Sequence, residues 1–182
     1  MHFEAIYREH FASLWRAVQR FGVPERDAAD ATQEVFVIAH RRFSEFEGRS
    51  SLRTWLFGIA FRVAAGRRRR ASEQREVLEP AGAEARPDPA DDPEALAMRR
   101  ELRGLLQLGL AALPIEQRAV FTLFELEGFS GEEIADALSE SEGTVRSRLR
   151  LARATFSRVV KAALASDQRI LNPQQVLEAA HE

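Results

Sequence analysis

SGEEIADALSESEGTVRSRLRLAR, residues 130–153, is the stretch that decides the fold of the chain's second half. Ser130 is followed three residues later by Glu133, which is the spacing of a capping box at the start of a helix. Residues 139–141 supply turn chemistry, and the hydroxyl of Ser141 is placed to cap a second helix. The stretch therefore predicts two short helices around a tight turn, a helix-turn-helix.

The second helix of this motif separates an apolar side from a basic side. Its expected buried stripe consists of Val145, Leu149, Ala152 and Phe156. Ser147, Arg150 and Leu151 fall on the opposite side, because successive helical residues are about 100° apart. Residues 143–161 contain no acidic residue and carry Arg146, Arg148, Arg150, Arg153, Arg158 and Lys161. This pattern is typical of a recognition helix in a DNA major groove, and a solvated basic helix in an ordinary bundle is the alternative.

Composition limits the possible classes of protein. The chain has 182 residues, 45% of them hydrophobic, which is enough for one domain or two small ones. Its net charge is −2, but the charge is uneven: residues 67–70 are four arginines and the middle of the chain is acidic. There is no cysteine, so disulfides and thiolate metal sites are excluded.

Two further absences in the sequence shape the expectation. The four histidines are scattered and no glycine-rich phosphate loop occurs, so we expect neither an enzyme nor a cofactor or metal site. The start of the chain has no basic leader followed by an apolar run, and no segment is suited to crossing a bilayer. We therefore expect a cytoplasmic protein without direct membrane insertion.

The first part of the chain shows apolar residues at helical spacing in three segments, 3–21, 25–43 and 52–70. Gly22-Val23-Pro24 separates the first two, and Ser50 or Ser51 is placed to cap the third. No strand pattern competes with these helices. Residues 1–71 are therefore predicted to form a compact domain of three helices.

An acidic, proline-rich linker is predicted over residues 72–93, which contain four prolines and almost no large apolar residue. Residues 94–165 then form a second domain of four helices that ends with the helix-turn-helix. Within it, Pro114 fits the first position of a helix, and Gly128 fits its C-terminal cap with Phe129 folded back. Residues 166–182 are left as a C-terminal tail. The predicted fold is all-α, with two small helical domains joined by a flexible linker.

Four segments carry a resemblance to a known family. DATQEVF at residues 30–36 and SLRTWLFGIA at 51–60 resemble region 2 of the extracytoplasmic-function (ECF) sigma factors. Residues 113–118, beginning Leu-Pro, together with LEGFS and GTVRSRL in residues 126–149, resemble region 4 of the same proteins. The resemblance covers almost the whole chain apart from the linker and the last residues, and the two regions together are far more specific than either one.

This resemblance implies a role in bacterial transcription. Such a protein binds the core of RNA polymerase and directs it to promoters, with region 4 reading the −35 element and region 2 opening and holding the −10 element. The implied partners are the β′ clamp helices and β flap of the polymerase core, promoter DNA, and an anti-sigma factor.

The resemblance also implies sites in region 2. The polymerase-binding positions are Asp30, Gln33, Glu34 and Phe36, of which Phe36 is expected to lie partly in the core. The positions for the −10 element are Arg53, Trp55, Arg62, Arg67, Arg68 and Arg69, and the loop at 44–51 would take an extruded base. Arginine contacts to the DNA backbone are blind to sequence. Trp55 falls in the apolar stripe, which favours a core position over stacking on DNA.

In region 4 the resemblance assigns Ser147, Arg150 and Leu151 to the bases of the −35 element. Arg150 has the geometry to pair with O6 and N7 of guanine, which is worth about 1–3 kcal/mol of discrimination. The remaining −35 positions, Arg146, Arg148 and Arg153, are expected to reach phosphates.

The chain departs from the family pattern at several positions, which are Arg62, Gly66, Ser139, Glu140 and Leu151. The family usually has Asn at the position of Arg62, and it often has Arg at the position of Leu151. The exact −10 and −35 sequences therefore cannot be transferred from relatives.

A stand-alone helix-turn-helix regulator is the alternative function. It accounts for residues 130–153 but gives no role to the first domain or to the arginines at 67–70. No additional apolar helix offers the dimer face that such regulators need. A sigma factor accounts for both halves of the chain.

Overall fold

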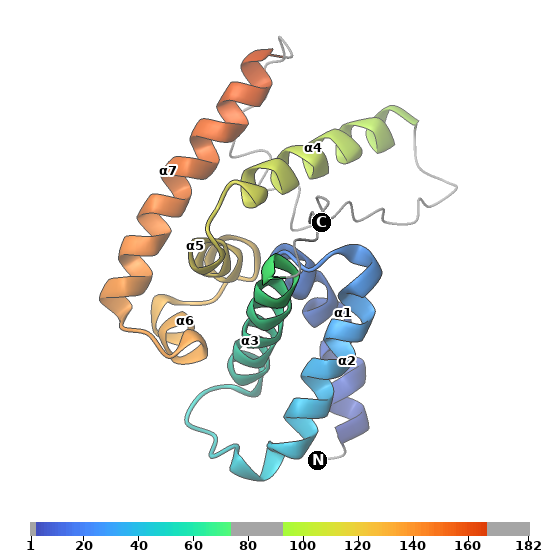
Figure 1. Cartoon of the computed structure of the whole chain (residues 1–182), viewed down its shortest axis with the longest axis vertical. Coiled ribbons are helices and arrows are strands. Elements are labelled where there is room, and N and C mark those ends of the chain that lie inside the picture. The colour runs from blue at the N-terminus through green and yellow to red at the C-terminus, as the bar shows by residue number, and fades with distance from the viewer. Residues whose placement is uncertain (1–2, 74–92, 167–182) are drawn as a thin grey trace.

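The structure is a computed structural model that describes residues 3–73 and 93–166. These residues form helices and their connections without any strand, which confirms the all-α prediction (Figure 1). The predicted linker and C-terminal tail lie outside the described residues except for their ends at 72–73, 93 and 166.

Three helices form the first part of the chain: α1 (Phe3–Arg20), α2 (Glu25–Arg41) and α3 (Leu52–Glu73). A short 3₁₀ helix, η1 (Phe43–Glu45), follows α2, which ends two residues earlier than predicted. Ser51 is the cap of α3, because its Oγ accepts a hydrogen bond from the Thr54 N–H at 3.0 Å. The three helices enclose a core with fully buried side chains at Leu14, Phe21, Leu56, Phe57 and Ile59.

The second part contains α4 (Pro93–Ala111), α5 (Ile115–Phe121), α6 (Gly131–Leu138) and α7 (Glu142–Ser166). The helix α5 continues directly into a π-helical turn, η2 (Thr122–Leu126), which the sequence analysis did not predict. The long helices α4 and α7 pack against each other, and α5 and α6 also contact α7 (Figure 1). Pro114 precedes the first residue of α5 and acts as its N-cap, one position from the predicted one.

The end of η2 follows the predicted cap. Gly128 has a φ of +69°, a conformation that glycine adopts without a side-chain penalty. The Phe129 N–H donates to the carbonyl of Leu123 at 2.9 Å, so the chain folds back over the last turn. The side chain of Phe129 is only 2% exposed.

The caps of the helix-turn-helix are also as predicted. Ser130 Oγ accepts from the Glu133 N–H at 3.2 Å, and Glu133 Oε2 accepts from the Ser130 N–H at 2.8 Å, which completes the capping box. Ser141 Oγ accepts from the Thr144 N–H at 3.1 Å at the start of α7. Between the two helices, Ser139 has a φ of 56°, a left-handed conformation that costs a serine more than it would cost a glycine.

The two groups of helices are packed against each other, a contact that the sequence analysis did not predict. Helix α3 contacts α6 (Figure 1). At this contact the ring centroids of Phe57 and Phe129 lie 5.0 Å apart. Gly58 allows this approach, because a Cβ at that position would lie 2.5 Å from the carbonyl oxygen of Ala137. The buried residues of both groups therefore form one continuous hydrophobic cluster.

Candidate nucleic-acid and protein interfaces

One side of α7 is anchored and the other is open to solvent. The predicted apolar stripe is buried, with exposed fractions of 2% at Val145, 7% at Leu149, 0% at Ala152 and 1% at Phe156. The opposite side exposes Arg146, Ser147, Arg150 and Leu151. Leu151 is 43% exposed, so its side chain is available for an apolar contact. The helix thus presents a rigid row of side chains outside the core.

Two of the α7 arginines form ion pairs with acidic residues from the same half of the chain. Arg148 Nη1 donates to Glu140 Oε1 at 2.8 Å, so the glutamate that departs from the family pattern has an ion-pair partner. Arg153 pairs with Glu125 and lies over the ring of Phe124 at 5.1 Å from its centroid. These contacts orient the two guanidinium groups. Among the described residues, Arg146 and Arg150 form no such ion pair.

The basic end of α3 is connected to α2. Arg67 forms an ion pair with Glu34 at 2.8 Å, so one predicted −10 position and one predicted polymerase position contact each other. Arg69 is exposed. Arg62 is exposed, but partial burial of its guanidinium lowers its pKa, and the charge of Arg42, at the end of α2, lowers it further.

Trp55 belongs to an aromatic cluster at the start of α3. Its ring centroid lies 5.3 Å from that of Phe46 and 6.5 Å from that of Phe43. The tryptophan is half-buried and packs against the hydrophobic core. Residues of the loop at 44–51 therefore adjoin a platform of aromatic rings.

The predicted polymerase-binding positions separate into two groups. Asp30 and Gln33 are exposed on α2, one helical turn apart, and Glu34 is half-buried beside Arg67. Phe36 is 4% exposed, and its ring packs against Tyr7 with centroids 4.7 Å apart. The assignment of Phe36 to a contact surface is corrected, because this side chain fills the core between α1 and α2.

Arg53 lies at the boundary between the two groups of helices, α1 to α3 and α4 to α7, which we call the two modules. Its Nη2 donates to the backbone carbonyl of Glu127 at 2.7 Å and lies 3.4 Å from the carboxylate oxygen Oε2 of the same residue. The guanidinium also lies over the ring of Phe129, 4.1 Å from its centroid. A residue predicted to contact the −10 element thus also contacts the second group of helices.

Glu127 is held between two arginines and was not found by the sequence analysis. Arg20 Nη1 donates to its Oε1 at 2.8 Å, and the glutamate side chain is 7% exposed. Burial raises the pKa of Glu127, although the charges of Arg20 and Arg53 act in the opposite direction. Arg20 and Arg53 are separated from Glu127 by 107 and 74 positions in the sequence, so no local pattern signals this cluster of three side chains.

Arg118 is a buried cation at the same boundary. It is 7% exposed, and its Nε has no hydrogen-bond partner. A Cβ on Gly22 would lie 2.5 Å from its Nη1, so the guanidinium sits directly against the turn after α1. Burial, and then the charge of Arg68, lowers the pKa of Arg118 to about 10.

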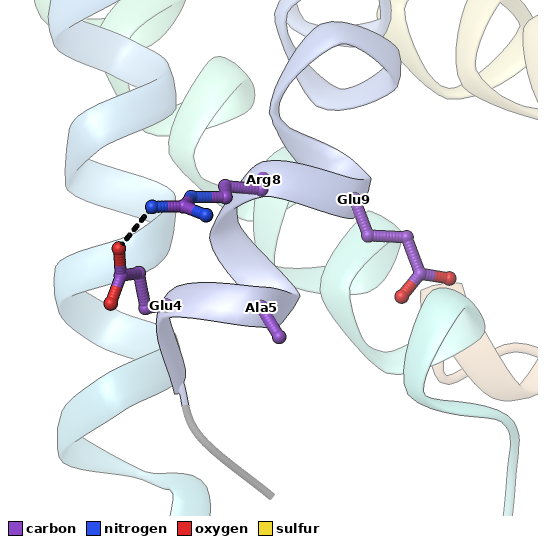
Figure 2. A pocket seen from close by; sticks show the side chains of 4 residues that line it. All are labelled: Glu4, Ala5, Arg8 and Glu9. Atoms are coloured by element: carbon purple, nitrogen blue, oxygen red, sulfur yellow. Dashed lines mark hydrogen bonds and ion pairs between the residues drawn. The ribbon is translucent and has the colours of Figure 1, made fainter.

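The outer side of α1 carries a shallow, open depression lined by Glu4, Ala5, Arg8 and Glu9 (Figure 2). An ion pair joins Arg8 to Glu4, and both side chains are more than 70% exposed, at 77% and 72%. Such pairs contribute little to stability, and nothing in this depression selects a ligand.

The comparisons with known proteins match both halves of the chain. Residues 6–74 match sigma-70 region 2, and residues 103–156 match sigma-70 region 4. The ECF RNA polymerase sigma-E factor of Escherichia coli K12 is 37% identical over 165 residues, which cover 85% of this chain and 83% of that protein. The chain belongs to the ECF sigma factors. The alternative of a stand-alone regulator is set aside, because it leaves the region 2 match unexplained.

Further relatives support this assignment. The RNA polymerase sigma-H factor of Pseudomonas aeruginosa is 32% identical over 172 residues, covering 89% of this chain and 88% of that protein. The sigma factor RpoE from Bartonella quintana, solved in complex with the anti-sigma factor NepR, has the same fold. It has a TM-score of 0.67 and 22% identity, over 87% of this chain and 96% of that chain. CnrH, solved with the cytosolic domain of CnrY, has a TM-score of 0.64 and 25% identity over 88% of each chain.

As an ECF sigma factor, the chain directs promoter-specific initiation of transcription by RNA polymerase. Region 2 comprises α1 to α3, and the matched part of region 4 begins inside α4 and extends into α7. None of the described helices combines the length and apolar character needed to cross a membrane.

Proposed function

We propose that α7 places Ser147, Arg150 and Leu151 against the bases of the −35 element. The observation that carries this proposal is the exposed row on α7, whose opposite side is fixed in the core. Arg146 and the two anchored arginines, Arg148 and Arg153, contact flanking phosphates. Leu151 offers an apolar contact such as one to a thymine methyl.

Region 2 acts on the −10 element in this proposal. Unstacking a base costs a few kcal/mol, which phosphate contacts and stacking must offset. The extruded base is held in the loop at 44–51, and Arg62, which lies close to Arg42 at the end of α2, supplies a cation on that side. Arg67–Arg69 lie several turns further along α3 and contact the DNA backbone away from this loop. The cluster of Phe43, Phe46 and Trp55 supports this loop from the core side.

The polymerase core contacts α2 in this proposal through Asp30 and Gln33, with Glu34 and Arg67 at the edge of the same surface. The polymerase β flap contacts region 4. The domains comprise residues 1–71 and 94–165, with a linker at 72–93 and a tail at 166–182. The protein works in the cytoplasm and has no catalytic activity of its own. The two solved relatives bound to NepR and CnrY support an anti-sigma factor as a further partner.

Arg150→Ala is expected to change which base is preferred at one position of the −35 element. Losing a bidentate contact to guanine reduces discrimination at that base pair by about 1–3 kcal/mol. The measurement is run-off transcription with polymerase core on a set of promoters that differ at single −35 positions. Arg158→Ala, an exposed arginine further along α7, is the control. Equal weakening on every promoter would make Arg150 a phosphate contact instead.

Replacing both Asp30 and Gln33 with Ala is expected to weaken binding to polymerase core. Both side chains are exposed and make no packing contribution, so the fold should be unaffected. Central interface contacts lose more than about 1 kcal/mol each on truncation to alanine. Glu9→Ala, on the exposed side of α1, is the matched surface control. Unchanged affinity for core, measured by fluorescence anisotropy, would show that this side of α2 is merely solvated.

A further inference from the structure

Two arginines from distant parts of the chain converge on the turn between α1 and α2. Gly22, in this turn, has a φ of +103°. A Cβ on this glycine would lie 2.5 Å from Nη1 of Arg118 and 3.2 Å from Nη1 of Arg68. Both nitrogens are thus close to the same point, and the missing side chain leaves room for the two guanidinium groups to be close neighbours.

No carboxylate of the described residues neutralises these two cations. The charge of Arg68 adds to burial in lowering the pKa of Arg118, and no acidic group acts in the opposite direction. The acidic residues that follow the turn are Glu25 and Asp27, and the carboxylate of Asp27 lies 3.7 Å from Arg26 instead. Buried charges are normally paired, so a pair of guanidinium groups without an anion is an incomplete arrangement.

The unsatisfied hydrogen-bonding atoms near this boundary are all able to donate. Within the described part of the chain, the buried side-chain atoms without a hydrogen-bond partner are Arg118 Nε, Thr122 Oγ1 and Gln19 Nε2. Thr122 follows Arg118 by one helical turn where α5 continues into η2, and Gln19 lies in the last turn of α1, three residues before Gly22. These elements therefore lack an acceptor, and the two cations favour an acceptor with negative charge.

The exposure of the two arginines limits the size of a ligand. Arg118 is only 7% exposed, whereas Arg68 and Gly22 are half-buried and connect the site with solvent. A phosphate ion is small, carries up to two negative charges at neutral pH, and offers several acceptor oxygens. Guanidinium groups bind such oxyanions through pairs of charge-assisted hydrogen bonds.

We propose that Arg68 and Arg118 form a binding site for a small inorganic oxyanion of the phosphate class beside Gly22. One oxyanion bridges the two guanidinium groups and supplies the negative charge that the neighbouring side chains do not. The bound anion then connects α3 and α5 at the turn after α1. Arg68 is also a proposed contact of the DNA backbone, but the anion site does not depend on that role, because it is tested without DNA.

Isothermal titration calorimetry of the full-length protein with inorganic phosphate, at constant ionic strength, tests this proposal. One phosphate per chain is expected to bind. At a phosphate concentration about a hundredfold above the Kd, the ratio of folded to unfolded protein should rise about a hundredfold. Arg118→Met and Arg68→Gln should each weaken phosphate binding at least about tenfold, because each removes a charge-assisted contact. Urea unfolding confirms beforehand that both variants are folded.

Arg70→Gln is the matched control, because it removes the same charge from an exposed position of the same helix and should leave the affinity for phosphate unchanged. ATP should bind more weakly than phosphate, since Arg118 is too enclosed for a large ligand, and equally tight binding of ATP would overturn the assignment to a small free anion. The absence of saturable phosphate binding by the unaltered protein also overturns the proposal and leaves the donors to ordered water. Unchanged affinity in either folded arginine variant overturns it as well, because the protein then binds phosphate as an adventitious ion only.

Discussion

Phe156→Ala is expected to lower the free energy of unfolding by about 3–5 kcal/mol, the usual range for deleting a buried phenyl ring. The side chain is 1% exposed and stacks on Phe121, with ring centroids 4.7 Å apart and planes at 28°. A Cβ on Gly109 would lie 2.3 Å from the ring, so Phe156 touches the backbone of α4 directly. Backbone on one side and a stacked ring on the other leave little freedom for the site to collapse around the cavity.

Urea unfolding followed by circular dichroism measures this loss. Leu108→Ala on α4 is the control, because a leucine that is 47% exposed leaves no cavity when it is truncated. The Phe156 variant should also lose −35 binding, since the ring joins α7 to α4 and α5. A loss below about 1 kcal/mol would mean that neighbouring side chains fill the space.

The parts of the fold that the sequence predicted are those set by local chemistry. The capping box at Ser130, the cap at Ser141 and the left-handed Gly128 each depend on atoms within a few residues. The apolar stripe of α7 was also predicted, because helical periodicity alone places Val145 and Phe156 on one side.

The sequence analysis was incomplete where packing between distant parts of the chain determines the structure. Phe36 was expected to lie only partly in the core, but packing against the aromatic rings of α1 leaves it only 4% exposed. The docking of α6 on α3 left no periodic signal, because it depends on the absence of a side chain at Gly58. Glu127 was missed for the same reason, since its partners Arg20 and Arg53 come from the other module.

The charges at the boundary make the packing between the two modules less stable than its apolar contacts alone would. Arg118 is buried against Gly22 without an acidic partner among the described residues, and Arg68 adds repulsion. Lowering the pKa of Arg118 to about 10 corresponds to roughly 3 kcal/mol against the charged guanidinium. Because the pKa of a base is lowered, this cost is fully present at neutral pH and falls only as the pH rises above about 10, where the folded protein begins to lose the proton.

Arg118→Met is therefore expected to raise the free energy of unfolding by up to about 3 kcal/mol, because an unbranched apolar chain occupies the space of the arginine stem without a buried charge. Urea unfolding measures this change. Arg100→Met, at an exposed arginine of α4, should leave the free energy of unfolding unchanged. A less stable Arg118→Met protein would show that the guanidinium contributes more by its contact with the turn at Gly22 than its dehydration costs.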